Sequence, residues 1–340
     1  MIQTAADPTP RRPRLRRWTV RLAWAYAVFV ASVALAVWQF ADEAVLPTLL
    51  LFGPRWVIAG PLAVLAPAAA VVRSRAAAVA VVLAGVIVAG PITGGHVNLG
   101  GGGGKAAGAG LRIVTWNIGG GDLTRENVRA YFRDTRADIL VLQETIGRAR
   151  PEVFPDGWHV ATGTMGTAVA SRFPVKEAGG LAIADLDAHG GVGRYLIDSP
   201  GGQLVLVNVH LPTQRNGIEA VLQNKFGGFP SMRATIAERA KASGRVRAWV
   251  GEPDPAVFVC GDFNMPAEST IFQRDWSVFG NAFGDAGVGW GTTKQTRWFG
   301  SRIDHILYAP PWRCAKVRVG PDLGSDHRPV LAEFVSSPEP

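Results

Sequence analysis

The hydrophobic pattern divides the chain into two unlike parts. Residues 22–41 form an uncharged stretch of twenty residues, and two further apolar stretches of about seventeen residues follow at 56–72 and 76–92. An α-helix needs about 20 apolar residues to cross a bilayer, and about 17 is the lower limit. From residue 111 onward, short apolar runs alternate with polar segments instead. The pattern predicts an N-terminal module of three transmembrane helices followed by a globular domain.

Other interpretations of the apolar stretches stay open. A cleavable signal peptide has a shorter apolar core and a small-residue cleavage site, whereas the first stretch ends in AVWQFADEA, which favours a retained helix. The second and third stretches also suit a hydrophobic hairpin packed on a soluble domain, although Pro61 and Pro67 are tolerated in membrane helices. A transporter or membrane sensor is a further class, but short helices without interior charges offer little for transport.

The excess positive charge belongs to the predicted membrane module. The chain has a net charge of +8, of which residues 1–110 carry +7 and residues 111–340 only +1. Six arginines precede the first helix and Arg73 and Arg75 separate the second from the third, whereas Asp42, Glu43 and Arg55 lie between the first two. Because basic residues favour the cytoplasmic side, we expect a cytoplasmic N-terminus. Three crossings then place the globular domain outside the cytoplasm, and two crossings would place it inside.

The chain has three predicted segments: a membrane module at 1–92, a linker at 93–110 and a globular domain at 111–336. The linker, TGGHVNLGGGGGKAAGAG, is a glycine-rich flexible tether. It is not predicted to bind phosphate as a P-loop does, since no Lys-Ser or Lys-Thr pair follows it. The two cysteines, Cys260 and Cys314, fit neither a disulfide framework nor a cysteine zinc site, and free thiols are favoured over one bridge.

The sequence pattern of the globular part predicts an α/β domain. Short strand-like runs include LRIVTWNI, ADILVLQET, GGQLVLVNVHL, AVFVCGDF and SRIDHILYA. Such nearly continuous apolar runs suit sheets that are buried on both faces or packed against another sheet. Helical segments, such as TRENVRAYFRDTR and SMRATIAERAKASG, lie between them.

Polar residues recur at the ends of these runs. They are Asn117, Glu144, His210, the pair Asp262 and Asn264, Asp304, and the pair Asp326 and His327. Each alone has an ordinary explanation as a cap, a loop charge or a satisfied buried histidine, but their recurrence at the ends of strands indicates one site. Carboxylates without cysteine ligands favour Mg²⁺ or Mn²⁺. A base, an orienting amide and a donor to an anion are the parts that water attack on phosphorus needs.

The ordered series Asn, Gln-Glu, His, Gly-Asp-Phe-Asn, Ile-Asp-His and Ser-Asp-His resembles the endonuclease/exonuclease/phosphatase family over about residues 111–334. That family comprises Mg²⁺-dependent phosphoesterases such as deoxyribonuclease I, abasic-site endonucleases, neutral sphingomyelinases and inositol-polyphosphate phosphatases. The resemblance implies a four-layer α/β sandwich, with two sheets face to face, helices outside and the site at one edge of both sheets. Bacterial members with an N-terminal membrane module are similar to this chain.

The resemblance also implies a metal site. Glu144 is similar to the family's principal metal ligand. Asn117 is expected beside it, either as a ligand or as a hydrogen-bonding partner. Asp326 is similar to a further carboxylate of the metal site.

The remaining site residues are given catalytic roles by the resemblance. Asp262 is similar to the residue that orients or deprotonates the attacking water, and Asn264 to the amide that holds this residue and the phosphate. His327 is similar to the histidine that contacts the scissile phosphate, with Asp304 fixing its tautomer. A histidine at position 210 is typical of the deoxyribonuclease and sphingomyelinase branches, and we expect His210 to donate to a phosphate oxygen or to the leaving group.

Three neighbouring candidates are not assigned to the site. His305 follows Asp304 and alternates to the other face of its strand, which indicates a structural residue. Arg172 and Arg302 would be able to contact a substrate, but Arg172 in ASRFPV suits a structural position at a strand turn.

The sequence thus predicts a membrane-anchored, outward-facing, metal-dependent phosphodiesterase without a predicted protein partner. Its substrate is either nucleic acid or a phospholipid head group. A net charge of +1 on residues 111–340 does not supply the bulk basic footprint of a duplex-DNA nuclease, although residues 233–247 are locally basic. A phosphomonoesterase is an alternative. So is an inactive binding domain on the same fold, which the presence of every expected catalytic residue disfavours.

Overall fold

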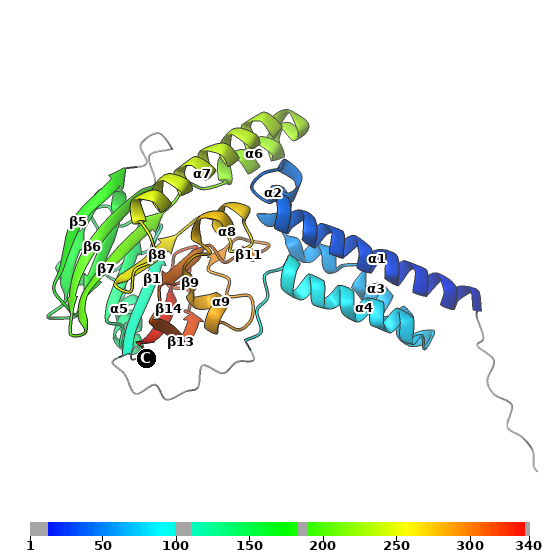
Figure 1. The fold of residues 1–340 in the computed structure, drawn as a ribbon, viewed down its shortest axis with the longest axis horizontal. Helices are drawn as coiled ribbons and strands as arrows, with labels where there is room; N and C mark the ends of the chain where they lie inside the picture. Colours follow the sequence, from blue (N-terminus) through cyan, green and yellow to red (C-terminus); the bar gives the residue numbers. More distant parts are fainter. Residues whose placement is uncertain (1–12, 99–109, 183–189, 337–340) are drawn as a thin grey trace, which may run out of the picture.

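The computed structural model describes residues 13–98, 110–182 and 190–336. They form a bundle of apolar helices that projects from an α/β domain with two mixed six-stranded sheets (Figure 1). The predicted α/β class is therefore confirmed. Most of the predicted linker, residues 99–109, lies outside the described residues.

The N-terminal helices are α1 (Pro13–Phe40), α2 (Val45–Leu51), η1 (Arg55–Ala59), α3 (Leu62–Val71), α4 (Arg75–Ile87) and η2 (Val88–Ile92). Two of them, Pro13–Phe40 and the continuous Arg75–Ile92, are long and apolar enough to cross a membrane. The second predicted stretch, 56–72, lies in Arg55–Val71, which is too short to count as a span alone and is bent by 93° from α2. Gly53 and Pro54 lie at the bend, where proline removes a backbone donor and interrupts the helix. The module therefore has two candidate spans, or three if the bent pair forms one.

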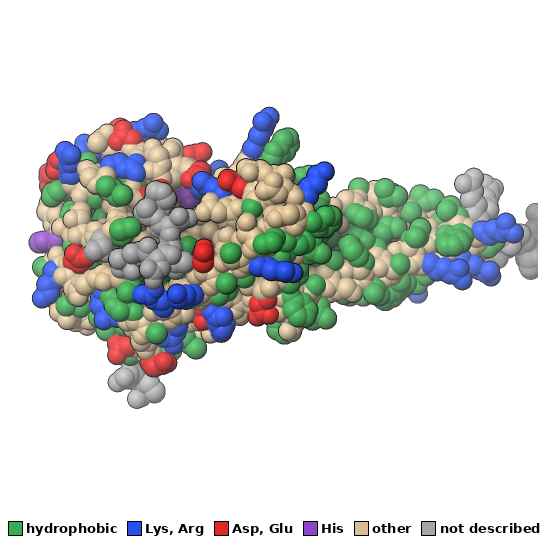
Figure 2. Space-filling view, turned by 90° about the horizontal axis from the view of Figure 1, so that it is seen from above, with side chains coloured by type: hydrophobic (Ala, Val, Ile, Leu, Met, Phe, Trp, Pro, Cys, Tyr) green, Lys and Arg blue, Asp and Glu red, His purple; other side chains and the backbone are tan. Residues whose placement is uncertain are grey.

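The helical bundle has many alanines inside and many large apolar residues on its surface. Ala23 and Ala27 of α1 pack with Ala77, Ala80 and Ala84 of α4, and all five are buried. Small residues at a helix interface let the backbones approach closely, as in membrane bundles. Many of the large apolar side chains, such as Leu22 and Phe29, point outward, and Figure 2 shows apolar side chains covering the projecting part of the molecule. An apolar surface of this extent is typical of a region covered by lipid or protein.

The first sheet has the strand order β13-β14-β1-β2-β4-β3. These strands are β1 (Gly110–Asn117), β2 (Ile139–Gln143), β3 (His159–Thr162), β4 (Ala168–Ser171), β13 (Trp312–Val319) and β14 (Val330–Ser336). The pair β1 and β2 is parallel, and the other neighbours are antiparallel.

The second sheet has the order β5-β6-β7-β8-β12-β9. Its strands are β5 (Val175–Ala182), β6 (Gly191–Ser199), β7 (Gly202–His210), β8 (Val257–Asp262), β9 (Gly280–Asn281) and β12 (Asp304–Tyr308). Here β7 and β8 form the parallel pair, and the other neighbours are antiparallel. Each sheet thus has one central parallel pair.

The core lies between the sheets and on their outer faces. Ile113 of the first sheet and Leu206 of the second belong to one apolar cluster. Phe132 of α5 (Glu126–Thr135) packs on the outer face of the first sheet. Val246 of α7 (Phe229–Val250) and Trp276 of α8 (Thr270–Trp276) pack on the outer face of the second. The remaining elements are η3 (Pro151–Val153), η4 (Thr164–Gly166), α6 (Arg215–Asn224), η5 (Lys225–Gly228), α9 (Ala282–Ala286), β10 (Lys294–Gln295) and β11 (Gly300–Ser301).

The two parallel pairs end at polar residues. In register, Asn117 of β1 lies beside Gln143 of β2, and His210 of β7 lies beside Asp262 of β8. Asp304 begins β12 opposite Asp262. This arrangement gathers polar strand ends at one edge of the domain.

The helical bundle and the α/β domain are joined by buried charges. Arg239 of α7 forms an ion pair with Asp42, which follows α1, and both side chains are fully buried. Arg55 of η1 lies 3.9 Å from the carboxylate of Glu268.

Of the two cysteines, Cys260 is buried and Cys314 half-buried, and both are free, as favoured from the sequence.

Candidate active site

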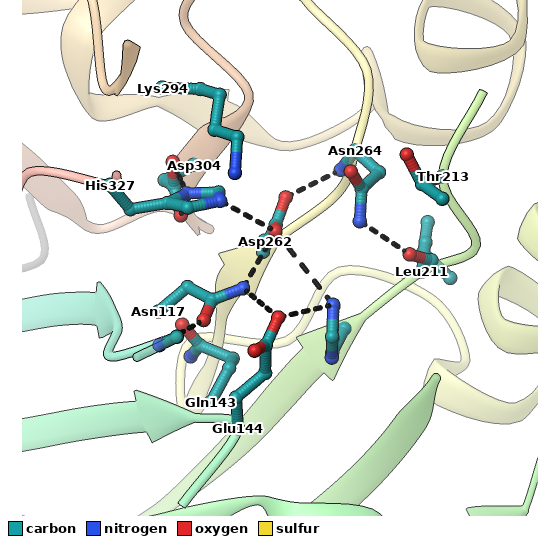
Figure 3. Close-up of polar contacts among 12 residues, drawn as sticks. Asn117, Gln143, Glu144, Leu211, Thr213, Asp262, Asn264, Lys294, Asp304 and His327 are labelled. Carbon is teal, nitrogen blue, oxygen red and sulfur yellow. Dashed lines mark hydrogen bonds and ion pairs between the residues drawn. The ribbon is translucent and has the colours of Figure 1, made fainter. Parts of the chain in front are cut away.

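Asp262, the last residue of β8, lies at the centre of the polar cluster (Figure 3). It is 1% exposed. Its Oδ1 accepts a hydrogen bond from the backbone N–H of Asn264 at 2.8 Å, and its Oδ2 accepts one from Nδ2 of Asn117 at 3.0 Å. Burial raises the pKa of Asp262, Asp304 raises it further, and His327 and His210 oppose this rise. A fixed carboxylate with a raised pKa is suited to accept a proton.

Asn264 turns the chain back toward Asp262. Its φ of +50° lies in the left-handed region, which asparagine adopts more readily than most residues. Its backbone holds Asp262, whereas its side-chain Nδ2 donates to the carbonyl oxygen of Leu211 at 2.7 Å. The amide group expected from the sequence to hold Asp262 is therefore, in this geometry, the backbone amide of Asn264.

Asn117 connects Glu144 with Asp262. Its Nδ2 donates to Oε1 of Glu144 at 2.9 Å as well as to Asp262, and its Oδ1 accepts from the backbone N–H of Gly119 at 2.9 Å. Glu144 follows β2 with a φ of +56°, and its side chain is 42% exposed. The carboxylate of Glu144 is thus open to the surface, while that of Asp262 is buried behind it.

His327 and Asp304 form a buried pair. Nδ1 of His327 lies 2.9 Å from Oδ2 of Asp304, and its Nε2 lies 3.6 Å from Oδ2 of Asp262. Burial works to lower the pKa of His327, but Asp304 and Asp262 outweigh it and raise the pKa to about 9. His327 is therefore positively charged at neutral pH, and Asp304 fixes which nitrogen faces Asp262.

Two contacts tie the loop of His327 to β1. Ser325 donates to the carbonyl oxygen of Asn117 at 2.9 Å and accepts from the backbone N–H of His327 at 3.1 Å. Trp116 donates from Nε1 to the carbonyl oxygen of His327 at 3.0 Å. The loop is thereby held against the first sheet, although the acidic partners of His327 belong to the second.

His210 lies between two carboxylates. Its Nε2 is 3.7 Å from Oε1 of Glu144 and 3.8 Å from Oδ2 of Asp262. Its Nδ1 is buried and has no hydrogen-bond partner among the described residues. The sequence does not identify a partner carboxylate for His210. The fold places these two carboxylates beside it.

Asp326 lies beside Lys294 rather than in the buried cluster. Its carboxylate forms an ion pair with the Lys294 ammonium. Partial burial works to raise the pKa of Asp326, but Lys294 outweighs it and holds the pKa below its ordinary value. A Cβ on Gly119 would lie 3.5 Å from Oδ1 of Asp326 and 3.9 Å from Oε2 of Glu144. Both carboxylates therefore border the same space beside Gly119.

The donor set fits a divalent cation. The exposed oxygens of Glu144 and Asp326 that border the space beside Gly119 are hard ligands, which suit cations such as Mg²⁺. A second group, Asp262, Asp304 and His327, has potential ligand atoms within 4.8 Å of one another. In that group Nδ1 of His327 is already paired with Asp304. The exposed carboxylates are thus less committed to protein partners than the buried group.

A pocket of about 470 Å³ lies at this site. Its lining includes Glu144, His210, Asp262, Asn264 and His327. Four basic residues, Arg148, Arg215, Arg239 and Lys294, line it as well. The pocket thus combines a buried carboxylate with several positive groups, a combination that suits a phosphoester.

Residues 114–327 match the sequence profile described as the Endonuclease/Exonuclease/phosphatase family. The chain belongs to this family. The resemblance inferred from the ordered motifs is therefore confirmed. Among curated proteins, none matches the chain.

Three solved structures illustrate what the chain is similar to. One is an endonuclease/exonuclease/phosphatase from Beutenbergia cavernae, with 17% identity, 67% of this chain and 72% of that chain covered, and a TM-score of 0.49. Another is D. rerio TDP2 in complex with a single-strand DNA product, with 18% identity, coverage of 67% and 100%, and a TM-score of 0.47. A third is a mannosyl-6-phosphatase from Bacteroides thetaiotaomicron, with 16% identity, coverage of 66% and 99%, and a TM-score of 0.48. Identities at this level say nothing of the substrate.

Several residues that line the pocket or lie beneath it were not assigned to the site from the sequence. Lys294 begins the two-residue strand β10 and belongs to no recognisable motif, and Arg148 and Arg215 are isolated arginines. Gln143 and Asn208 carry a signal, since each is a polar residue within a strongly apolar run. Nε2 of Gln143 donates to Oδ1 of Asn208 at 2.7 Å, which links the two sheets directly beneath the site.

The residues left out of the expected site lie elsewhere. His305 is buried against the ring of Phe272, with Nε2 3.0 Å from the carbonyl oxygen of Met265. Arg172 lies 3.9 Å from Asp138. Arg302 donates to the carbonyl oxygen of Trp290 at 2.8 Å, near the helical bundle.

Proposed function

We propose that this protein is a membrane-anchored, divalent-metal-dependent phosphodiesterase that cleaves its substrate by water attack at phosphorus. The observation that carries the proposal is the buried carboxylate of Asp262 facing the positively charged His327 at the wall of one pocket. A base and an anion donor at the wall of one pocket are the minimum for hydrolysis of a phosphoester.

In the proposed reaction, Asp262 orients a water molecule and takes its proton as the water attacks. Asn117 and the backbone of Asn264 keep the carboxylate in place by hydrogen bonds. His327 donates from Nε2 to a non-bridging phosphate oxygen, and Asp304 holds its ring from the other side. His210 donates to a phosphate oxygen or to the departing oxygen.

A divalent cation, Mg²⁺ or Mn²⁺, is proposed for the exposed carboxylates Glu144 and Asp326, with Asn117 orienting Glu144. When bound, such a cation neutralises the charge that develops on the phosphoryl group. Lys294 neutralises Asp326 in its absence, and we expect this ion pair to open when the cation binds.

The anchor is proposed to cross the bilayer three times, with the N-terminus in the cytoplasm and the catalytic domain outside. Trp18 and Trp38 of α1 are 58% and 63% exposed. They are separated along the helix by about 30 Å at 1.5 Å per residue, which is the thickness of the hydrocarbon core. Tryptophan prefers both membrane–water interfaces, so this spacing supports a transmembrane α1.

The substrate is proposed to be either nucleic acid or a phospholipid head group. TDP2, bound to a DNA product in its crystal structure, keeps the nucleic-acid candidate open. The attachment of the domain to an apolar bundle favours a lipid. A phosphomonoesterase and an inactive binding domain remain the alternatives that the following experiment excludes or selects.

The experiment uses the full chain in lipid nanodiscs with methyl nitrophenyl phosphate, a soluble phosphodiester. We expect hydrolysis that requires Mg²⁺ or Mn²⁺ and stops on chelation. Asp262→Asn and His327→Ala should each lower kcat by about 10²–10⁴-fold, the usual contribution of an acid or base. Asp156→Asn, an exposed carboxylate before β3, is the matched control. Equal turnover by the Asp262→Asn variant would refute the assignment, and turnover of nitrophenyl phosphate alone would select the phosphomonoesterase.

A further inference from the structure

The helical hairpin formed by α6, η5 and α7 has an apolar tip. Phe226 is 81% exposed, the highest value among the large apolar side chains of the described residues, and Leu222 is 75% exposed. Lys225, also exposed, lies between them in the sequence. Exposed apolar side chains next to a lysine are unusual on a water-facing surface and typical of a segment at a lipid interface.

The same hairpin packs on the helical bundle next to its tip. Val45 of α2 shares an apolar cluster with Met232 and Ile236 of α7, and Leu49 and Phe229 pack against it. Figure 1 shows the hairpin projecting toward the side from which the bundle leaves the domain. The apolar tip is therefore continuous with the surface at which the bundle would enter a bilayer.

A second projection lies at the bundle, at the turn between β10 and β11. Trp298 in this turn is 70% exposed, and the guanidinium of Arg297 lies 5.2 Å from its ring centroid. The carbonyl oxygen of Trp298 accepts a hydrogen bond from Nε1 of Trp56, a residue of η1, at 3.1 Å. This turn also combines an exposed aromatic side chain with a basic one, and it contacts the bundle directly.

Both projections are connected to the catalytic pocket at their other ends. Arg215 and Asn216, at the start of α6, line the pocket, and so does Lys294 of β10. Lys294 pairs with Asp326 of the candidate metal site. One continuous element thus runs from each projection to a wall of the pocket.

We propose that the tip of the α6–α7 hairpin and the β10–β11 turn are a second bilayer contact of the catalytic domain, and that the pocket between them acts on phosphodiesters held in the same bilayer. This inference rests on the proposed function, since it needs both a bilayer and a phosphodiesterase. Leu222, Phe226 and Trp298 enter the head-group region, and Lys225 and Arg297 pair with lipid phosphates. The contact fixes the orientation of the pocket, which the helices alone would leave free to tilt.

The bilayer contact is tested by site-specific fluorescence of the full chain. The variants Phe226→Cys and Trp298→Cys, in a Cys314→Ser background, carry an environment-sensitive nitrobenzoxadiazole label. The protein is reconstituted in phosphatidylcholine–phosphatidylglycerol vesicles with a doxyl-labelled phosphatidylcholine as quencher. Val28→Cys on α1 is the positive reference, and Ala178→Cys on β5, far from the bundle in Figure 1, is the negative one.

Quenching at positions 226 and 298, as at position 28, is the expected result. Labels at 226 and 298 that respond like the one at 178, with position 28 still quenched, would overturn the second contact. A label at 28 without quenching would instead overturn the membrane anchoring, and the inference with it. Loss of fluorescence that appears only when a vesicle holds two labelled chains, and that does not need the doxyl lipid, would assign the tip to contact between copies of the chain.

The consequence for the substrate is tested with two matched esters. Hexadecyl nitrophenyl phosphate is held in the vesicles, and methyl nitrophenyl phosphate is soluble. The variant Leu222→Ser/Phe226→Ser should lose about tenfold in turnover of the hexadecyl ester, because a misplaced site reacts slowly, and keep its rate on the methyl ester. Val278→Ser, an exposed valine outside the hairpin, is the matched control. If the double variant loses turnover equally on both esters, or on neither of them, the proposed role of the hairpin tip is refuted. If the wild type hydrolyses neither ester, the proposed function itself is refuted.

Discussion

At the scale of single residues, the site depends on opposite charges placed out of water. Asp262, Asp304 and His327 are each at most 3% exposed. Burying an isolated charge costs several kcal/mol, so these groups persist only as a hydrogen-bonded set. Burial raises the pKa of Asp262, whereas the neighbouring Asp304 and Asp262 raise the pKa of His327 against its burial. The burial that costs free energy thus also shifts the pKa values of Asp262, the proposed base, and of His327, the proposed donor.

Asp304→Asn should move the alkaline limb of the pH profile to lower pH. Asp304 helps to raise the pKa of His327 to about 9 from its ordinary 6.5. In the wild type, activity should fall as pH rises through about 9, because His327 loses its proton. Without the carboxylate, that loss begins nearer to neutral pH. The profile of kcat/KM on methyl nitrophenyl phosphate measures this shift.

The exposed Asp156 provides the control for this profile, as Asp156→Asn removes the same charge outside the pocket. An alkaline limb that stays in place in Asp304→Asn would show that His327 is not the titrating donor.

His305 should make the protein less stable in mild acid. Burial holds the pKa of His305 at about 4, below its ordinary 6.5. A lowered pKa means that the unfolded chain binds the proton more readily, so stability is complete above pH 6.5 and falls as pH drops to about 4. The full effect is about 3 kcal/mol at 1.36 kcal/mol per unit. Thermal unfolding in detergent across this range measures it.

His305→Asn is the informative variant, because it keeps polar groups beside Met265 and Asn281 without a titrating ring. Its melting temperature should be lower at neutral pH but should change less between pH 6.5 and 4 than that of the wild type. An unchanged acid dependence would assign the loss to other groups.

At the scale of elements, the two parallel strand pairs and one helix decide the geometry of the site. The pairs bring the ends of β1, β2, β7 and β8 to one edge. Arg239 of α7 then connects this edge with the membrane module. It pairs with Asp42, donates to Gln214 at 2.8 Å, and donates to the carbonyl oxygen of Asn264 at 3.0 Å. The module therefore contributes directly to the position of a site residue.

Asp42→Asn should destabilise the full chain by about 3–5 kcal/mol, since it leaves Arg239 buried without a counter-ion. The double variant Asp42→Asn/Arg239→Met should recover much of this loss, because no unpaired charge remains. Urea unfolding in detergent, followed by near-UV circular dichroism, gives the free energies.

Glu43→Gln is the matched control, as Glu43 is the adjacent but exposed carboxylate. Similar losses for Asp42→Asn and Glu43→Gln would mean that the buried pair does not couple the module to the domain. Because residues 13–98 contribute Asp42 and Arg55 to buried pairs, a fragment that starts at residue 111 would lack both.

At the scale of the whole molecule, charge and shape give the same orientation. Arg73, Arg75 and the arginines at the start of α1 belong to the end of the bundle far from the α/β domain, where Figure 2 shows a group of basic side chains. By the positive-inside rule we expect that end in the cytoplasm. Three crossings, as proposed, would then put the α/β domain on the opposite side.

An alkaline phosphatase reporter fused after Pro340 should therefore be active, since this reporter needs an extracytoplasmic location. The same reporter fused after Arg73, between the second and third stretches, should be inactive. Activity at position 73 together with a silent C-terminal fusion would indicate two crossings and a cytoplasmic domain. Equal protein levels on immunoblots make the comparison valid.

Much of the site was predictable because its residues belong to ordered local motifs. Asp262 and Asn264 are two positions apart at the end of an apolar run, and Asp326 and His327 are adjacent. Such spacing can be read from a few neighbouring residues without knowledge of the rest of the chain. The residues that were not predicted, such as Lys294 and Arg148, reach the pocket from segments whose sequence has no recognisable pattern. Only the tertiary fold brings these residues to the pocket.

The sequence by itself determined the apolar module, the α/β class, the family and the set of polar strand ends, because these follow from periodicity, charge and short motifs. Only the tertiary structure decided that the Asn264 backbone holds Asp262, that Gln143 bonds Asn208 across the sheets, and that Asp42 pairs with Arg239. Asp42 and Arg239 are 197 positions apart. Contacts of this kind come from the packing of whole elements, and no local pattern specifies which buried charge will meet which.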